Sequence, residues 1–97
     1  MSRKIKKVSF VFGTRPEAIK LCPLILAMKD HSDFETHICV TAQHREMLDQ
    51  VLDVFKIVPD VDLELMEPNQ TLARLTSRAI AKIDDYISEH KPDMIIV

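Results

Sequence analysis

The sequence predicts an α/β fold built on a doubly wound parallel sheet. Short apolar runs rich in β-branched residues alternate with longer segments whose apolar residues recur at helical spacing. Their order is β-α-β-α-β-α-β with short connections, which implies right-handed crossovers and helices on both faces of the sheet. The 97 residues are 46% hydrophobic and 29% charged, so we expect a single small globular unit.

The first expected strand covers residues 8–12, which are mostly β-branched or aromatic. It leads into Gly13, the only glycine of the chain, where we expect a sharp turn. Thr14 is suited to cap the helix that follows, Pro16 fits its first turn, and Glu17 places a favourable negative charge there.

The first helix is expected to reach Lys29 and to bury Ile19, Cys22 and Leu26. Pro23 lies inside this helix. Because proline lacks an N–H and crowds the preceding turn, we expect a kink at this position.

The rest of the chain continues the alternation. Strands are expected at residues 36–41, 61–65 and 94–97, and the expected sheet order is 3-2-1-4. A helix is expected at residues 44–55, and a longer one starts at residues 68–71 and stops at Lys91-Pro92. The expected buried faces of these helices are Met47, Leu48, Val51, Leu52 and Phe55 in the first, and Leu72, Leu75, Ala79, Ile83 and Tyr86 or Ile87 in the second.

Overall charge and residue usage exclude several classes of protein. The net charge of -2 gives no reason to expect a nucleic-acid partner or an anionic membrane surface. No apolar run is long enough to span a membrane and no secretion signal is present, so we expect a cytoplasmic protein. Cys22 and Cys39 are expected to be buried reduced thiols, and the histidines lack metal-ligand spacing, so we expect no metal.

The sequence stops at the end of an expected central strand. In open α/β sheets, ligands bind beyond the carboxyl ends of the strands, and the loop that would follow this strand is missing. A bare central strand also leaves an uncovered apolar edge. We therefore expect the chain to be a fragment of a longer protein.

Residues 12–20, FGTRPEAIK, combine a strand end, a glycine turn, a cationic side chain and a helix start. A helix N-terminus offers N–H groups and partial positive charge to an anion. Arg15 adds a planar guanidinium suited to phosphate or carboxylate, and Lys20 follows one to two turns along. The segment predicts a site for a phosphorylated ligand, although exposed helix charges are the alternative explanation. The GxGxxG and GxxxxGK(S/T) patterns are absent.

Two strings together resemble a known enzyme family. FGTRPEAIK, followed by PL, resembles the opening of the non-hydrolysing UDP-N-acetylglucosamine (UDP-GlcNAc) 2-epimerases. VTAQHREMLDQ, at residues 40–50, resembles their second strand–helix junction, and Lys91-Pro92-Asp93 resembles the entry to a later strand. The resemblance extends from about Val8 to Val97.

The resemblance implies a two-domain fold similar to type-B glycosyltransferases, with the active site between two Rossmann-like domains. Residues 1–97 would form the first part of the N-terminal domain. The implied parent enzyme interconverts UDP-GlcNAc and UDP-ManNAc by elimination and re-addition of UDP, and serves the synthesis of cell-surface polysaccharide precursors. The implied ligand is a UDP-sugar, the implied assembly is a homodimer, and no cofactor is implied.

The resemblance also assigns residues to sites. Arg15 and Lys20 match positions that contact the UDP-sugar substrate, and the catalytic carboxylates and histidine are expected beyond Val97. By the same resemblance, some relatives carry glutamine in place of Glu46 and arginine in place of Asn69, and both differences would weaken a diphosphate contact in this chain. Residues that resemble a second, regulatory UDP-GlcNAc site are Gln43, His44, Glu46 and Gln70, with turn and helix-cap chemistry as the alternative for Gln43 and His44.

Two other functions compete with this interpretation. A hydrolysing 2-epimerase releases free ManNAc, but those relatives usually lack the equivalents of Pro16, Glu17 and Lys20. The 97 residues could instead act as a non-catalytic module that binds a nucleotide sugar or a partner. For the fragment by itself we expect no catalysis, because the paired carboxylates that the chemistry needs are not among its residues.

Overall fold

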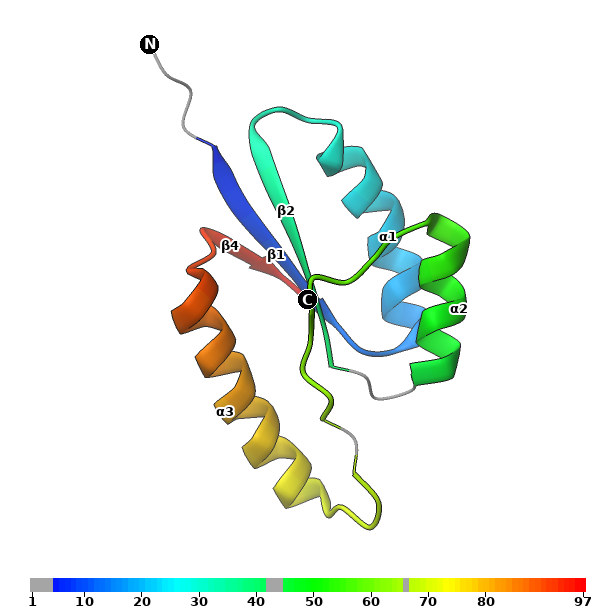
Figure 1. Cartoon of the computed structure of the whole chain (residues 1–97), viewed down its shortest axis with the longest axis vertical. Coiled ribbons are helices and arrows are strands. Elements are labelled where there is room, and N and C mark those ends of the chain that lie inside the picture. Colours follow the sequence, from blue (N-terminus) through cyan, green and yellow to red (C-terminus); the bar gives the residue numbers. More distant parts are fainter. Residues whose placement is uncertain (1–4, 42–44, 66) are drawn as a thin grey trace.

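The chain forms one four-stranded parallel sheet with helices on both faces (Figure 1). This computed structural model describes residues 5–41, 45–65 and 67–97, without the side chains of Arg45 and Met47. The strands are β1 (Lys6–Phe12), β2 (Phe34–Val40), β3 (Val61–Asp62) and β4 (Met94–Ile96). The helices are α1 (Arg15–Lys29), α2 (Arg45–Phe55) and α3 (Leu72–His90).

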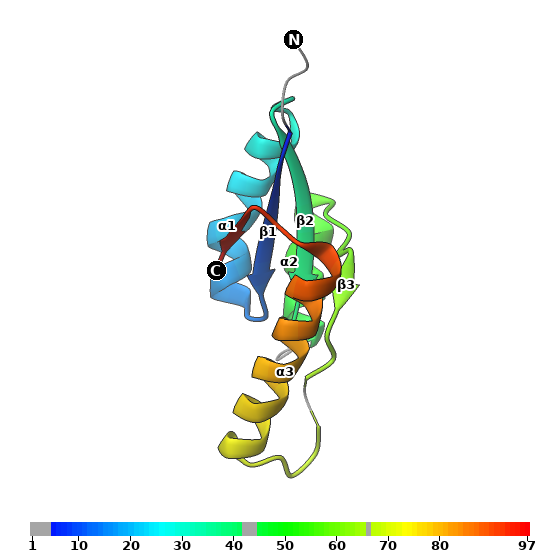
Figure 2. The same cartoon turned by 90° about the vertical axis from the view of Figure 1, so that its left-hand side faces the viewer.

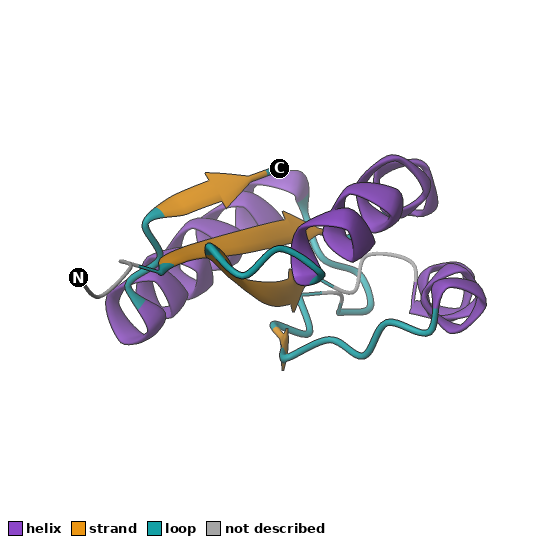
Figure 3. Ribbon diagram, turned by 90° about the horizontal axis from the view of Figure 1, so that it is seen from above, coloured by secondary structure: helices purple, strands orange, loops and turns teal. Residues whose placement is uncertain are grey.

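The sheet order is β3-β2-β1-β4, which confirms the predicted order 3-2-1-4. All three pairings are parallel, and β1 pairs with β2 over its whole length, from Lys6 opposite Phe34 to Phe12 opposite Val40. Figure 2 shows α1 and α3 on opposite sides of the strands, and Figure 3 shows the sheet from above with the helices flanking it. The predicted doubly wound α/β class is therefore confirmed.

The larger core lies between the sheet and the layer of α1 and α2. From α1 it takes Ala18, Cys22 and Ile25, which share one helix face at spacings of four and three. Ile19 and Leu26, predicted to be buried, are 49% and 37% exposed. Each follows a buried residue by one position, and one residue turns the helix by about 100°, away from the sheet.

The face predicted for α2 is correct where the structure describes it. Leu48, Val51 and Leu52 are buried against the same core, and Phe55 packs against it half-buried. Met47 belongs to the predicted face, but its side chain lies outside the described residues.

The smaller core lies between the sheet and α3. Tyr86 is the buried residue of α3, with Leu75, Ala79 and Ile83 half-buried beside it, as the helical spacing predicted. Leu72, predicted on the same face, is 79% exposed because it is the first residue of α3 and extends past the sheet.

The third strand is shorter than the predicted residues 61–65. Glu64 has a φ of 50°, a left-handed conformation that an extended strand does not allow. The segment still follows β2, because Leu63 N donates to Val40 O at 2.8 Å and Leu65 N donates to Thr41 O at 3.1 Å. The alternating pattern therefore identified the burial of Leu63 and Leu65, but not the end of the strand.

The turn between β1 and α1 is held by a reciprocal capping box. Thr14 is the N-cap, as predicted, and its hydroxyl accepts from Glu17 N. The Glu17 carboxylate accepts from Gly13 N at 2.9 Å and from Thr14 N at 3.3 Å. The turn forms without a positive φ at Gly13. Helix α1 continues through Pro23, and the kink expected there stays a prediction.

We expect Glu17→Ala to lower the free energy of unfolding by about 1–2 kcal/mol, because it leaves two backbone donors without their charged acceptor. Glu17→Gln should keep most of the stability, since its amide oxygen can still accept. The measurement is urea unfolding followed by circular dichroism. Asp84→Ala, at an exposed position of α3, is the matched control and should change stability by less than about 0.5 kcal/mol. An equal loss in both alanine variants would contradict the role given to Glu17.

Candidate functional site

The carboxyl ends of the strands meet at one edge of the sheet, where the first strand–helix turn lies. Thr41 N, just after β2, donates to Phe12 O at the end of β1 at 3.0 Å. Gly13 and Thr41, the residues that directly follow β1 and β2, are both buried. Ligands of open α/β sheets bind beyond this edge, and the segment 13–20 begins there.

Three backbone N–H groups at this turn already donate hydrogen bonds within the chain. The N–H groups of Gly13 and Thr14 donate to the Glu17 carboxylate, and Glu17 N donates to the Thr14 hydroxyl. The expectation that this helix start offers free N–H groups to an anion is therefore wrong for these three positions. A negative carboxylate also stands at the positive end of the helix dipole. At these three positions an anion would have to be bound by cationic side chains rather than by the backbone.

The structure places both predicted substrate-binding residues on α1, with exposed side chains. Arg15 is the first residue of the helix, beside the carboxyl edge of the sheet. Lys20 follows five residues later, about 7.5 Å along the axis and about 140° around it. Only Arg15 is thus at the edge itself, and the helix does not bring the two cations onto one face.

The predicted regulatory residues fall in two places. Gln43 and His44 lie outside the described residues. Glu46 is exposed in the first turn of α2. Gln70 is half-buried before α3, where its Nε2 donates to Leu65 O at 3.1 Å and its Oε1 accepts from Arg78 at 3.0 Å. Both ends of the Gln70 amide are therefore engaged within the chain.

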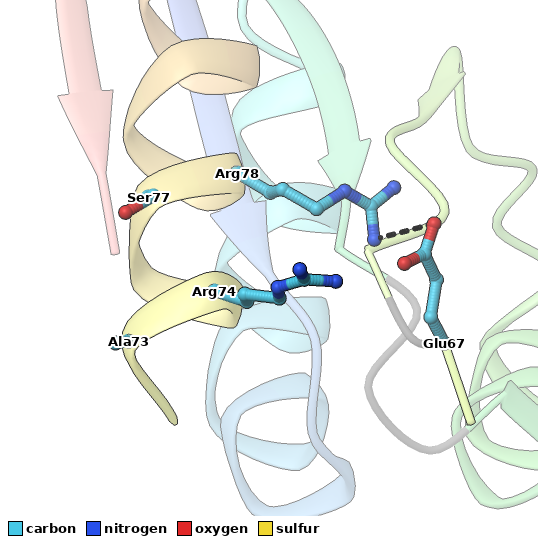
Figure 4. Close-up of a pocket in the computed structure, with 5 residues that line it drawn as sticks. All are labelled: Glu67, Ala73, Arg74, Ser77 and Arg78. Carbon is cyan, nitrogen blue, oxygen red and sulfur yellow. Dashed lines mark ion pairs between the residues drawn. The ribbon is translucent and has the colours of Figure 1, made fainter. Parts of the chain in front are cut away.

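Next to Gln70, the start of α3 carries two arginines that the sequence analysis missed. Arg78 Nη1 donates to Leu65 O at 3.0 Å and pairs with a Glu67 carboxylate oxygen at 3.0 Å. Figure 4 shows Arg74 and Arg78 extending from α3 on the side that faces Glu67. These residues line a pocket of about 390 Å³, together with Ala73 and Ser77.

The signal for these arginines was present in the sequence. Arg74 and Arg78 are four residues apart, so they share a helix face, and both follow the expected helix start. Asn69 takes the left-handed conformation with a φ of 59° and is exposed. The position where some relatives place a cation is therefore a turn residue here, while Arg78 brings a cation to Gln70 from the helix.

The two cysteines are free and buried, as predicted. Burial raises the pKa of Cys22, and burial together with the nearby Asp62 raises the pKa of Cys39 to about 12. Both thiols therefore stay protonated at neutral pH and are poor nucleophiles.

Residues 5–41, 45–65 and 67–97, which the structure describes, contain neither a metal-binding cluster nor a membrane-spanning helix. No group of three or more histidine, cysteine or acidic side chains there is arranged to hold a metal ion. None of the helices described is long and apolar enough to cross a membrane.

Comparison with known proteins gives concordant matches. The family model for UDP-N-acetylglucosamine 2-epimerase matches residues 26–97. The UDP-N-acetylglucosamine 2-epimerase of Bacillus subtilis is 53% identical over 91 residues, which are 94% of this chain and 24% of the relative. A crystal structure of a UDP-N-acetylglucosamine 2-epimerase superposes with a TM-score of 0.89 at 51% identity, over 99% of this chain and 26% of that one.

A second solved structure adds a ligand. The UDP-GlcNAc 2-epimerase from Neisseria meningitidis, bound to UDP-GlcNAc, superposes with a TM-score of 0.83 at 50% identity, over 92% of this chain and 24% of that one. The chain spans about a quarter of the length of the curated relatives it matches. With the family model matching well over half of its residues, the chain belongs to the UDP-N-acetylglucosamine 2-epimerase family.

Proposed function

We propose that residues 1–97 are the first part of the N-terminal domain of a non-hydrolysing UDP-GlcNAc 2-epimerase. The parent protein interconverts UDP-GlcNAc and UDP-ManNAc for cell-surface polysaccharide precursors. In this proposal the parent is a cytoplasmic homodimer. The observation that carries the proposal is the first strand–helix turn, with an exposed Arg15 at the carboxyl edge of the sheet.

Arg15 has a defined task in this reaction. Elimination removes the proton on C2 of the sugar and breaks the bond from C1 to the UDP oxygen, so UDP departs as an anion. Re-addition returns that oxygen to C1 after C2 is protonated on the other face. A guanidinium beside the departing diphosphate stabilises the negative charge as it develops and holds UDP for its return. The relative from Neisseria meningitidis, solved with UDP-GlcNAc, supports a UDP-sugar as the ligand.

The capping box explains why a side chain takes this task. With the N–H groups of Gly13 and Thr14 bonded to Glu17, the turn is rigid before a ligand arrives. Because this turn is fixed, the backbone of Arg15, the first residue of α1, has a defined position at the edge of the sheet. We propose Lys20 as a second contact, reached along its flexible side chain from the next turns of α1.

The proposed second UDP-GlcNAc site would involve Gln43, His44, Glu46 and Gln70. The amide of Gln70 is held within the chain by Arg78 and Leu65. A regulatory ligand that uses Gln70 must therefore exchange these contacts or bind next to them. The pocket that Arg74 and Arg78 line is the adjoining cationic surface.

The 97-residue chain by itself should show no epimerisation, because it spans about a quarter of the curated relatives and holds none of the expected catalytic carboxylates. The measurement is conversion of UDP-GlcNAc by the purified chain, with a mock purification as the control for host enzyme. Turnover above that control contradicts the proposal. Titration of UDP-GlcNAc into the same chain tests the alternative of a binding module, which requires saturable binding.

In the full-length parent, Arg15→Ala should lower kcat/KM by about 100-fold, equivalent to about 2.7 kcal/mol, the low end for losing one preorganised donor to a developing charge. Arg15→Lys should recover only part of the loss, since a point charge cannot make two parallel hydrogen bonds. Steady-state kinetics measure both variants, and thermal melting confirms folding.

Lys29→Ala is the matched control for Arg15, because it removes an exposed cation from the last turn of the same helix. It should leave kcat/KM within about twofold, as surface substitutions away from a site generally do. If Arg15→Ala behaves like Lys29→Ala, Arg15 is an ordinary helix charge. Release of free ManNAc by the parent would instead indicate the hydrolysing reaction.

A further inference from the structure

Helix α3 is attached to the sheet differently from α1. The backbone of α1 comes close to β1 and β2, whereas no Cα atom of α3 lies within 8 Å of a Cα atom in either strand. Long side chains therefore bridge the gap. Near the end of α3, Tyr86 is the buried side chain that spans it.

Tyr86 ends in a polar cluster formed with Ser9 of β1, His37 of β2 and His90 of α3. The Tyr86 hydroxyl donates to Ser9 Oγ at 2.8 Å, and it lies 2.5 Å from His37 Nδ1. With the Tyr86 proton directed to Ser9, the Tyr86 oxygen can accept from His37 Nδ1 in the neutral tautomer that carries its proton on Nδ1. The His37 and His90 rings lie 4.5 Å apart between centroids. We call Ser9, His37, Tyr86 and His90 the Tyr86 cluster.

The groups around His37 disfavour a positive charge on its ring. Burial is the main cause that lowers the pKa of His37, and Lys7 and His90 lower it further, while Asp60 and Glu35 oppose them. Lys7 is fixed in this position because its Nζ donates to His90 O at 2.9 Å.

Charged groups reach the cluster from each neighbouring element. Strand β1 contributes Lys7, β2 contributes Glu35, the segment before β3 contributes Asp60, and α3 contributes His90 with Glu89 at 3.9 Å from its Nε2. Burial also raises the pKa of Tyr86, so its hydroxyl remains protonated. A pocket of about 390 Å³ beside Tyr86 and His90 gives solvent a route toward the cluster.

We propose that the Tyr86 cluster is a proton-sensitive latch: uptake of a proton by His37 weakens the attachment of the C-terminal half of α3 to the sheet. The neutral ring, protonated on Nδ1, fits the hydrogen-bond chain to Tyr86 and Ser9. A second proton, on Nε2, places a positive charge in the cluster next to Lys7 and His90. That charge is better solvated when α3 moves away from the sheet, so the proton shifts the equilibrium toward the detached arrangement.

The direction in which pH changes the attachment of α3 follows because His37 is neutral when α3 is docked on the sheet. In the detached state His37 is in water and takes up a proton near its ordinary value of 6.5, whereas docking holds its pKa lower. The stabilisation is therefore fully present above pH 6.5 and is lost as pH falls through 6.5 and toward the docked value.

Loosening of α3 has a consequence for the candidate regulatory region. Arg78 lies two turns before Tyr86 on the same helix and holds both Gln70 and Leu65. A shift of α3 therefore changes the setting of Gln70. This consequence rests on the proposed function, whereas the latch itself does not.

The chain offers a direct reporter for the latch. Tyr86 is the only tyrosine and tryptophan is absent, so tyrosine circular dichroism in the near ultraviolet reports on this cluster alone. In the 97-residue chain, we expect this signal to weaken as pH is lowered from about 7.5 to about 5, with a midpoint below the ordinary histidine value of 6.5. His37→Gln should abolish the transition, because glutamine can donate to Tyr86 but does not titrate.

His31→Gln is the matched control, since His31 is an exposed histidine outside the cluster, and it should retain the wild-type transition. A flat signal in the wild-type chain, or an unchanged transition in His37→Gln, overturns the latch. If His37→Gln does not fold, histidine and tyrosine proton NMR of the wild-type chain decides. The ring protons of Tyr86 must then move together with one histidine that titrates below 6.5, and movement without such a histidine refutes the proposal.

Discussion

The parallel pairing of β1 with β2 is the interaction on which the rest of the structure depends. It runs from Lys6 to Phe12 without interruption, whereas β3 and β4 add only short pairings at either side. Because side chains alternate along a strand, β1 turns Val8, Phe10 and Phe12 toward α1, while Ser9 and Val11 face α3. One strand thus supports both helical layers and delivers the 13–20 segment to the carboxyl edge of the sheet.

The two layers differ in how they meet this strand. Toward α1 the contact is apolar and close, with short or compact residues such as Ala18 and Cys22 at the interface. Toward α3, the fully buried Ser9 hydroxyl needs a hydrogen-bond partner, and Tyr86 supplies it across a wider gap. A polar anchor of this kind is specific in its geometry but sensitive to the protonation of its neighbours. An apolar layer has no equivalent sensitivity.

The usual order of doubly wound parallel sheets was sufficient to predict the sheet order. Periodicity in the sequence was sufficient to predict the helices and most buried faces, because these depend on spacings of two and 3.6 residues. It was wrong where local backbone decides, as at Glu64, whose left-handed conformation ends β3. It was also wrong where a helix face is narrower than its apolar residues suggest, as at Ile19. For the candidate site, the sequence predicted that Arg15 directly follows the first strand–helix turn, but contacts between distant segments could not be predicted from spacing. Arg78 on Gln70 and Tyr86 on Ser9 depend on how α3 lies over the sheet.

The capping box changes the physical basis of anion recognition at the first turn. A helix start with open N–H groups binds phosphate through the backbone, and most side-chain substitutions would then leave it intact. Here the Glu17 carboxylate occupies the N–H groups of Gly13 and Thr14, so this turn is complete without a ligand. The positive charge must come from a side chain. Arg15 is the cation that the helix places at the edge of the sheet, while Lys20 starts from another side of α1. In the proposed function, recognition of a diphosphate at this edge would therefore depend on Arg15, which substitution can remove without disturbing the turn that positions it.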